Sequence, residues 1–126
     1  MEHVLPNEVS EAWEHREGPV VFTTVDSDGI PNAIYAGAVG KHDDGTIVIA
    51  NNYFDKTIRN IRAGSDASVL FITDAGKAYQ IKGSISYHQD GPYFEFMKSW
   101  NSAKHPGHGA AAVAAREVYS GAERLL

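Results

Sequence analysis

The chain has 126 residues and contains no cysteine. This absence excludes disulfide bonds, thiolate nucleophiles, zinc fingers and cysteine-ligated iron–sulfur clusters. The sequence also lacks an apolar run approaching the ~18 residues that a membrane-spanning helix needs. Its first eight residues have neither the basic start nor the apolar stretch of a signal peptide. We therefore expect a cytoplasmic protein with no membrane partner.

Positive charge is scarce: 11 Lys and Arg face 16 Asp and Glu, which gives a net charge of −5 with neutral histidines. Proteins that bind nucleic acid or anionic membranes need a basic face, so we expect neither partner, although a local basic pocket is compatible with this balance. The common catalytic motifs are also missing, because the sequence has no Gly-x-Ser-x-Gly, no His-Glu-x-x-His and no Walker loop. No catalytic residue can be named from a motif.

The composition is that of an ordinary globular protein, with 43% hydrophobic and 21% charged residues. The length fits one domain over residues 1–126. The middle of the chain alternates β-branched and aromatic runs with turn dipeptides such as Asp28-Gly29 and Asp44-Gly45. Five short strands joined mainly by hairpins predict an antiparallel barrel or sandwich. The predicted strands are residues 20–25, 30–39, 46–52, 69–72 and 78–88.

Three segments have helical character. Residues 7–17 have apolar positions at helical spacing, with Asn7 or Ser10 as the expected cap. Asp55 is placed to cap a helix over residues 56–63, and a third helix is predicted over residues 92–100. A loop should follow at 101–109. Residues 110–126 are ambiguous, because alanine favours a helix whereas the valines there suit a closing strand.

The segment that joins the third strand to the second helix predicts an anion site. Asn51 and Asn52 end the strand, and Lys56 and Thr57 fall in the first helical turn. Free backbone N–H groups at a helix N-terminus attract phosphate, and Lys56 and Thr57 would add a charge and a hydroxyl donor. The simpler interpretation is a capped helix with an exposed lysine.

The second strand contains a stretch with few large side chains, Tyr35-Ala36-Gly37-Ala38-Val39-Gly40. Small side chains let a flat ligand or another backbone approach a strand closely, although a dry barrel interior near a bulge would need the same residues. Gln80 and two further polar residues share one face of the fifth strand, where they could line a cavity, contact a subunit or meet water. His105 and His108 could share a metal, but a turn with incidental histidines is the simpler interpretation because no third ligand lies nearby.

Taken in order, these motifs resemble the FMN-binding split-barrel proteins of the pyridoxamine 5′-phosphate oxidase-like family, in their short single-domain form. The similarity extends over residues 18–119, and its most specific part is the Lys-Thr-x-x-Asn helix start after an amide-tipped strand. The segments that carry it are residues 28–32, 45–52, 56–61, 79–83 and 105–107. The resemblance implies a mainly β, antiparallel, Greek-key-like split barrel. It also implies that residues 111–119 form a strand, against their propensity.

The resemblance further implies a homodimer with FMN bound between the subunits. In the family, the residues matching Lys56 and Thr57 hold the FMN phosphate, and those matching Asn51 and Asn52 lie along the ribityl and phosphate part. The stretch matching Tyr35, Ala36, Gly37 and Ala38 borders the isoalloxazine ring. The position of Gln80 often faces the flavin, sometimes from the other subunit.

Family members that oxidise pyridoxamine phosphate grip the substrate phosphate with a C-terminal segment rich in arginine and histidine, and residues 120–126 have no equivalent. We therefore expect an FMN-dependent oxidoreductase or electron-transfer protein with an unassigned donor and acceptor, rather than a pyridoxamine-phosphate oxidase. The alternative is a non-catalytic binding module for FMN, a deazaflavin or haem, with His88, His105 or His108 as the haem ligand. A structural dimer with an empty groove is a third interpretation.

Overall fold

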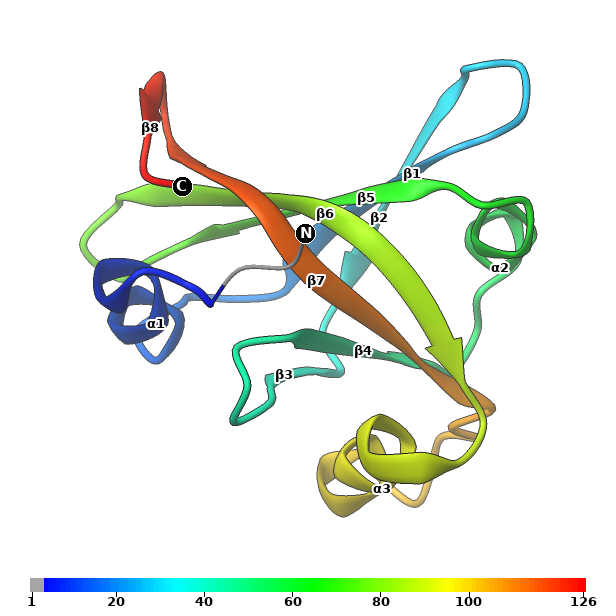
Figure 1. The fold of residues 1–126 in the computed structure, drawn as a ribbon. Helices are drawn as coiled ribbons and strands as arrows, with labels where there is room; N and C mark the ends of the chain where they lie inside the picture. Colours follow the sequence, from blue (N-terminus) through cyan, green and yellow to red (C-terminus); the bar gives the residue numbers. More distant parts are fainter. Residues whose placement is uncertain (1–3) are drawn as a thin grey trace.

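The computed structural model describes residues 4–126, so the start of the N-terminal segment considered above lies outside the described residues. Within that range the chain forms eight strands and three short helices (Figure 1). The elements are α1 (Asn7–Trp13), β1 (Val20–Val25), β2 (Pro31–Ala36), β3 (Val39–Lys41), β4 (Ile47–Asn51), α2 (Lys56–Arg62), β5 (Asp66–Ile72), β6 (Ala78–His88), α3 (Gly91–Trp100), β7 (Gly109–Ser120) and β8 (Glu123–Arg124).

The strands form one antiparallel sheet in the order β2-β1-β5-β6-β7-β4-β3, with β8 paired to β7. The sheet curls into a half-barrel, which confirms the predicted mainly β split-barrel fold (Figure 1). The curl is sharpest along the long strands β6 and β7, whose register shifts at a bulge beside Gly83. A Cβ at Gly83 would clash with the Ala114 carbonyl, so only glycine allows the strands to approach there.

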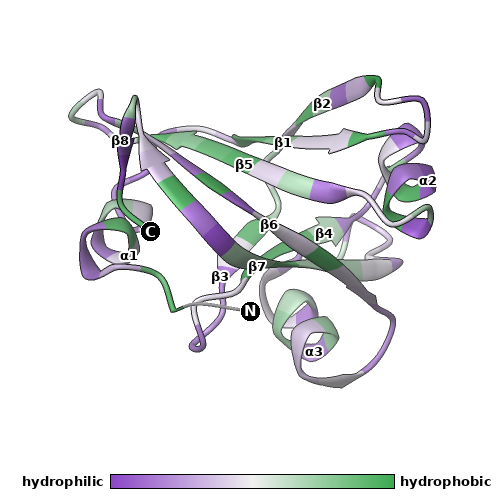
Figure 2. Cartoon of the chain, turned by 45° about the horizontal axis from the view of Figure 1, so that its top comes forward, coloured by the Kyte–Doolittle hydropathy of each residue, from purple (hydrophilic) through white to green (hydrophobic). Residues whose placement is uncertain are grey.

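The main core lies on the concave side of the sheet. Alternate residues of β1, β5 and β6 point inward, as the buried Phe22, Val69 and Ile81 show. α1 covers one end of this core, where the Trp13 ring meets the Phe71 ring edge-on at 5.1 Å between centroids. Figure 2 shows the resulting alternation of hydrophobic and hydrophilic positions along the strands.

A second, smaller core lies under α3. β4 is buried along its whole length because Val48 and Ala50 face α3 while its other side chains face the main core. Met97 of α3 and Ala110 of β7 complete this second cluster. β7 therefore lies between two packed layers, where small side chains are needed. The strand predicted for residues 111–119 is confirmed, and helix propensity gives way to this tertiary packing.

The single strand predicted over residues 30–39 is wrong. β2 ends at Ala36 and pairs with β1, whereas β3 begins at Val39 and pairs with β4. β2 and β3 stand at opposite ends of the strand order, so Gly37 and Ala38 carry the chain across the open side of the half-barrel. The local sequence gave no sign of this break, because small residues fit a strand and a crossing equally well.

The predicted helix boundaries need smaller corrections. α1 ends at Trp13 instead of residue 17, because Arg16 forms an isolated bridge with Thr73 of the β5–β6 hairpin. Pro6 occupies the N-cap position of α1, so neither expected capping residue serves there. Asp55 does occupy the N-cap of α2, but its side chain makes no capping hydrogen bond among the described residues and lies 3.7 Å from Arg59 instead.

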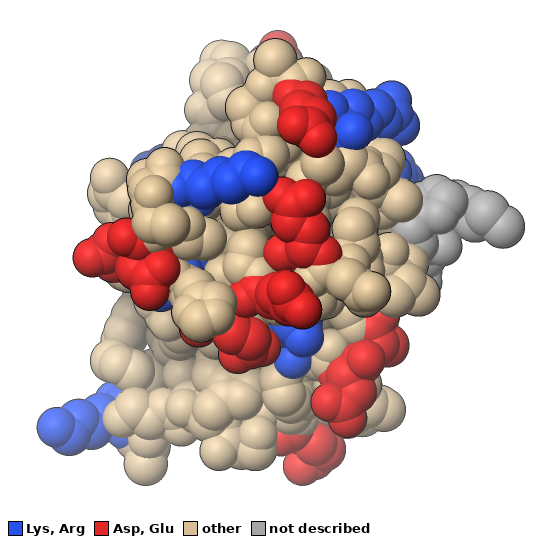
Figure 3. Space-filling model, turned by 90° about the vertical axis from the view of Figure 1, so that its left-hand side faces the viewer, with Lys and Arg blue, Asp and Glu red and all other residues tan. Residues whose placement is uncertain are grey.

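The outer surface at the α1 end has several separate patches of Asp and Glu, with Lys and Arg side chains between and around them (Figure 3). Three glutamates are exposed there: Glu8 and Glu11 in α1, and Glu14 at the C-cap of this helix. Within residues 4–126, no helix has the length and apolar character needed to cross a membrane.

Candidate cofactor cavity

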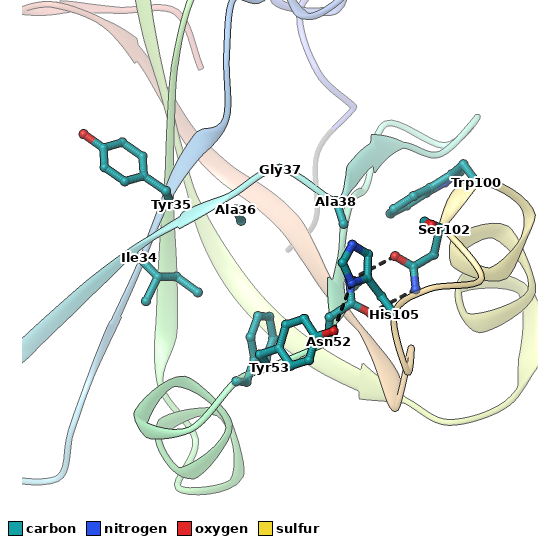
Figure 4. A pocket seen from close by; sticks show the side chains of 13 residues that line it. Ile34, Tyr35, Ala36, Gly37, Ala38, Asn52, Tyr53, Trp100, Ser102 and His105 are labelled. Atoms are coloured by element: carbon teal, nitrogen blue, oxygen red, sulfur yellow. Dashed lines mark hydrogen bonds between the residues drawn. The ribbon is translucent and has the colours of Figure 1, made fainter.

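A cavity of about 620 Å³ opens beside the crossing between β2 and β3 (Figure 4). Its volume falls within the range of small-molecule sites. Three parts of the chain form its walls: the end of β2 with the crossing, the end of β4 with the segment leading to α2, and the end of α3 with the loop that follows. The lining residues are Ile34, Tyr35, Ala36, Gly37, Ala38, Ala50, Asn52, Tyr53, Phe54, Trp100, Asn101, Ser102 and His105.

The first wall is almost free of side chains. Tyr35 is 80% exposed and points away from the cavity, so Ala36, Gly37 and Ala38 form the surface here (Figure 4). A Cβ built at Gly37 meets no atom within 4 Å among the described residues, and its backbone is not in the left-handed region. Neither close packing nor backbone conformation therefore requires glycine at this position. A dry, filled interior does not explain residue 37.

Asn52 is at the centre of the second wall and is only 9% exposed. Its Nδ2 donates to Asn101 Oδ1 at 3.0 Å, and its Oδ1 accepts from Asn101 Nδ2 at 2.9 Å. The same oxygen accepts from the backbone N–H of Gly107 at 2.9 Å. Both oxygen lone pairs are thus used, while one Nδ2 hydrogen is left for a ligand in the cavity.

Asn51 does not line this cavity. Its Nδ2 donates to the Tyr87 hydroxyl at 2.8 Å, and its Oδ1 accepts from the backbone N–H of Phe54 at 3.0 Å. These bonds fix the segment between β4 and α2. Asn51 is therefore close to the cavity in sequence, but its side chain does not face the cavity and instead stabilises the backbone of the second wall.

The third wall is formed by the end of α3 and the loop that follows. His105 of this wall contacts Tyr53 of the second wall, with 3.0 Å between the Tyr53 hydroxyl and His105 Nδ1 (Figure 4). Trp100, the last residue of α3, lies against Gly40, and its buried Nε1 has no hydrogen-bond partner within residues 4–126. The sequence signal for this wall was His105, which stands in the 105–107 segment of the family resemblance and was named as a candidate haem ligand.

A neighbouring cavity of about 530 Å³ lies at the start of α2. Lys56 and Arg59 of α2 line it, together with Pro31 and Asn32 of β2. Thr57 is 2% exposed, and its Oγ1 accepts a hydrogen bond from Asn32 Nδ2 at 3.3 Å. Thr57 itself lines neither cavity, and among the described residues no hydrogen bond donated by its hydroxyl is found. Sequence reasoning missed Arg59, although its spacing of three from Lys56 places both cations on one helix face.

The two cavities follow each other along β2. Residues 34–36 border the first cavity, and residues 31 and 32 border the second. The segment after β4 runs the same way, since Tyr53 and Phe54 line the first cavity and Lys56 lines the second. An uncharged surface of small residues therefore continues into a second cavity lined by two cations and by Asp26, whose Oδ1 accepts hydrogen bonds from the backbone N–H groups of Asp28 and Ile30.

Gln80 lies apart from the other predicted site residues. It faces outward on β6, and its Nε2 donates to Ser68 Oγ at 2.8 Å. The sheet register links it to Leu70, then Val21, then Tyr35 in one row. Three strand spacings put it roughly 14 Å from Tyr35. Within one chain, Gln80 is therefore outside both cavities.

No group of three or more His, Asp or Glu side chains in residues 4–126 is arranged to hold a metal ion. Of the two histidines in the 105–108 turn, only His105 lines the cavity.

Comparison with known proteins identifies the family. Residues 5–122 match the model of the pyridoxamine 5′-phosphate oxidase family. The chain belongs to this family. This family member is similar to the uncharacterized protein MJ0282 of Methanocaldococcus jannaschii. The two are 29% identical over 110 residues, which cover 82% of this chain and 74% of that protein.

Two solved structures show how widely the fold of this family is shared. An FMN-binding protein from Syntrophomonas wolfei superimposes with a TM-score of 0.73 at 19% identity, covering 87% of this chain and 81% of the other. HutZ, the heme storage protein of Vibrio cholerae, superimposes with a TM-score of 0.67 at 15% identity, covering 94% and 95%. At these identities the similarity shows the fold alone.

Proposed function

We propose that this protein binds FMN and works as an oxidoreductase or electron-transfer flavoprotein. The observation that carries the proposal is the pair of cavities along β2, one with a side-chain-free wall and the next with two cations. A molecule with a flat uncharged ring and a phosphate tail matches this order. The similar FMN-binding protein of Syntrophomonas wolfei supports the choice of FMN.

The donor groups around the second cavity suit a phosphate. Lys56 and Arg59 are exposed cations that can each donate charge-assisted hydrogen bonds, and the Thr57 hydroxyl can donate another. The surface ion pair between Arg59 and Asp55 at 3.7 Å does not prevent this, because such exposed pairs contribute little. We propose these three side chains as the phosphate anchors.

The remaining predicted residues hold the ring and the ribityl chain. Ala36, Gly37 and Ala38 offer a flat surface to the ring, and the spare Nδ2 hydrogen of Asn52 can donate to a ribityl oxygen or ring carbonyl. Asn51 contributes by fixing the segment that leads to α2. The bound FMN would supply one- and two-electron chemistry, while these residues bind, orient and shield it.

We also propose that the protein forms a homodimer, as the family resemblance implies, and that it is located in the cytoplasm. Tyr35, Val21, Leu70 and Gln80 form one row on the outer face of the sheet, and Tyr35 and Leu70 are exposed there. Gln80 lies outside its own chain's cavities, so any flavin that it faces belongs to the partner subunit.

A second candidate ligand is haem, favoured by one observation. His105 lines the larger cavity and uses only Nδ1 in its bond to Tyr53, so Nε2 is available as an axial ligand. The structural similarity to HutZ points the same way. His88 is less suited, because Ser86 lies 2.7 Å from its Nε2.

The deciding experiment is a visible spectrum of freshly purified protein, followed by release and identification of the chromophore and titration of the apoprotein. We expect flavin bands, FMN in the supernatant, and FMN binding at least ~10-fold tighter than riboflavin, since a charge-assisted hydrogen bond contributes about 1.5–3 kcal/mol. If the protein instead shows a Soret band, and His105→Ala removes that band, the bound ligand is haem rather than FMN. A colourless protein that binds neither added FMN nor added haem would refute both proposed functions.

A further inference from the structure

The middle of the cavity wall formed by residues 101–108 has few contacts of its own. Near its C-terminal end, Lys98 Nζ donates to the Pro106 carbonyl at 3.2 Å and the His108 N–H donates to the Asn51 carbonyl at 2.9 Å. Ser102 and His105 line the cavity, yet both are exposed, and the segment between α3 and β7 contains no helix or strand. One visible contact with the rest of the cavity, between the His105 ring and the Tyr53 hydroxyl, is made by a tyrosine that is 72% exposed. Water competes for such a bond, so it adds little to the position of the loop.

Both ends of this loop, however, converge on one buried side chain. Asn101 exchanges two hydrogen bonds with the Asn52 amide, and the N–H of Gly107 donates to the same Asn52 oxygen. Asn52 and Gly107 are both buried. Breaking this arrangement would leave buried amide groups without hydrogen-bond partners, which is unfavourable because water cannot replace those partners. The buried bonds therefore hold the loop far more firmly than the exposed one.

Glycine at 107 is needed for this arrangement. Its φ of +54° is strained for any other residue, and a Cβ there would lie 3.0 Å from Asn101 Nδ2 and 2.8 Å from Lys98 Nζ. The lysine can move away, because its end is flexible, but Asn101 is held by its own bonds to Asn52. A side chain at residue 107 would thus push directly on the amide pair.

We propose that Asn52, Asn101 and Gly107 form an amide clasp that fixes the 101–108 loop as a rigid wall of the cavity. The clasp makes Gly107 a positioning residue for the ligand although Gly107 itself does not line the cavity. This inference rests on the proposed function only for the identity of the ligand. The position of the loop can be tested without any ligand.

The first test measures the loop in the ligand-free protein. Lys104 is exposed in the middle of the loop, so trypsin cleavage after Lys104, followed by mass spectrometry, reports how often the loop leaves its place. We expect Gly107→Ala and Asn101→Asp to speed this cleavage at least tenfold. The matched control is Gly121→Ala, because Gly121 has a φ of +58° and no neighbouring atom within 4 Å of its Cβ position.

The second test measures FMN binding to the same variants by flavin fluorescence. We expect Gly107→Ala to weaken binding at least fivefold and Gly121→Ala to leave it unchanged at temperatures where both are folded. Cleavage of Gly107→Ala and Asn101→Asp no faster than that of Gly121→Ala would overturn the clasp. If the unaltered protein binds no FMN, the proposed function fails, and the cleavage comparison still decides the clasp.

Discussion

The two ends of the half-barrel differ in how closely their side chains are packed. At the α1 end, Trp13 is 2% exposed, packs against Phe71 and lies under the Arg16 guanidinium. At the α3 end, Trp100 is only partly buried, its N–H lacks a partner among the described residues, and it borders a cavity. The comparison teaches that the α1 end is packed for stability, whereas the α3 end leaves space and unused polar groups for a ligand.

The largest effect should come from removing the packed tryptophan. Trp13→Ala should lower the free energy of unfolding by about 3–5 kcal/mol, as expected for a fully buried aromatic residue. Trp100→Ala should cost roughly 1–2 kcal/mol because much less apolar area leaves a buried environment. Urea denaturation of both variants checks this order. Equal losses would remove the distinction between the two ends.

A second substitution addresses the ligand end alone. Lys56→Ala should weaken FMN binding by about 1.5–3 kcal/mol through loss of a charge-assisted hydrogen bond to the phosphate. The matched control is Arg62→Ala, an exposed cation of the same helix that lines neither cavity. Isothermal titration with FMN and with riboflavin separates the phosphate contribution. Unchanged FMN affinity in Lys56→Ala would remove that residue from the site.

Filling the open wall should harm binding without harming the fold. Gly37→Val places a side chain in space where a Cβ meets nothing, so the melting temperature should hardly change. FMN affinity should fall about tenfold, or ~1.4 kcal/mol, because the branched side chain keeps the ring from the strand. Ala33→Val on the preceding strand β2, outside both cavities, is the control. Loss of stability in Gly37→Val would show that the wall is packed.

The smallest expected effect concerns acid. Although partial burial raises the pKa of Asp44, hydrogen bonds from Tyr93 and Thr46 and the nearby His42 lower it to about 2 from an ordinary 3.8. A lowered folded-state pKa gives stability that is present above pH 3.8 and is lost as the pH falls through 3.8 toward 2.

Because the Asp44 side chain is 47% exposed, this contribution is about 1 kcal/mol after allowance for solvent screening. Asp44→Asn should remove it, so the variant should lose less stability than the unaltered protein between pH 4 and 2. Thermal melts across that range make the comparison. Parallel pH curves for the two proteins would show that another carboxylate dominates.

Sequence reasoning recovered the family, the sheet and most strand positions, because hairpin turns and period-two alternation are local signals. The strand at residues 111–119 came from family resemblance, since its alanines pack well only between β4 and β6. The break at Gly37 escaped notice, because it depends on β2 and β3 pairing with strands far apart in the sheet. Asn101 was missed for the same reason, because its role depends on Asn52 and Gly107, which folding brings next to it. Arg59 could have been found from its spacing to Lys56 alone.

The place of β7 in the sheet also has a consequence for how the chain folds. β7 pairs with both β6 and β4, for example Val113 with Ile85 and with Ile47, so it closes the sheet between two parts that are distant in sequence. Contacts of such long separation require large loop closures and form slowly. We expect pulsed hydrogen exchange during refolding to protect the amides of β1, β2 and β5 before those of β4. Before β7 pairs with β4, the edge of β4 is open to pairing with another chain. Such pairing leads to aggregation and depends on concentration, so dilute conditions should improve the yield of refolding.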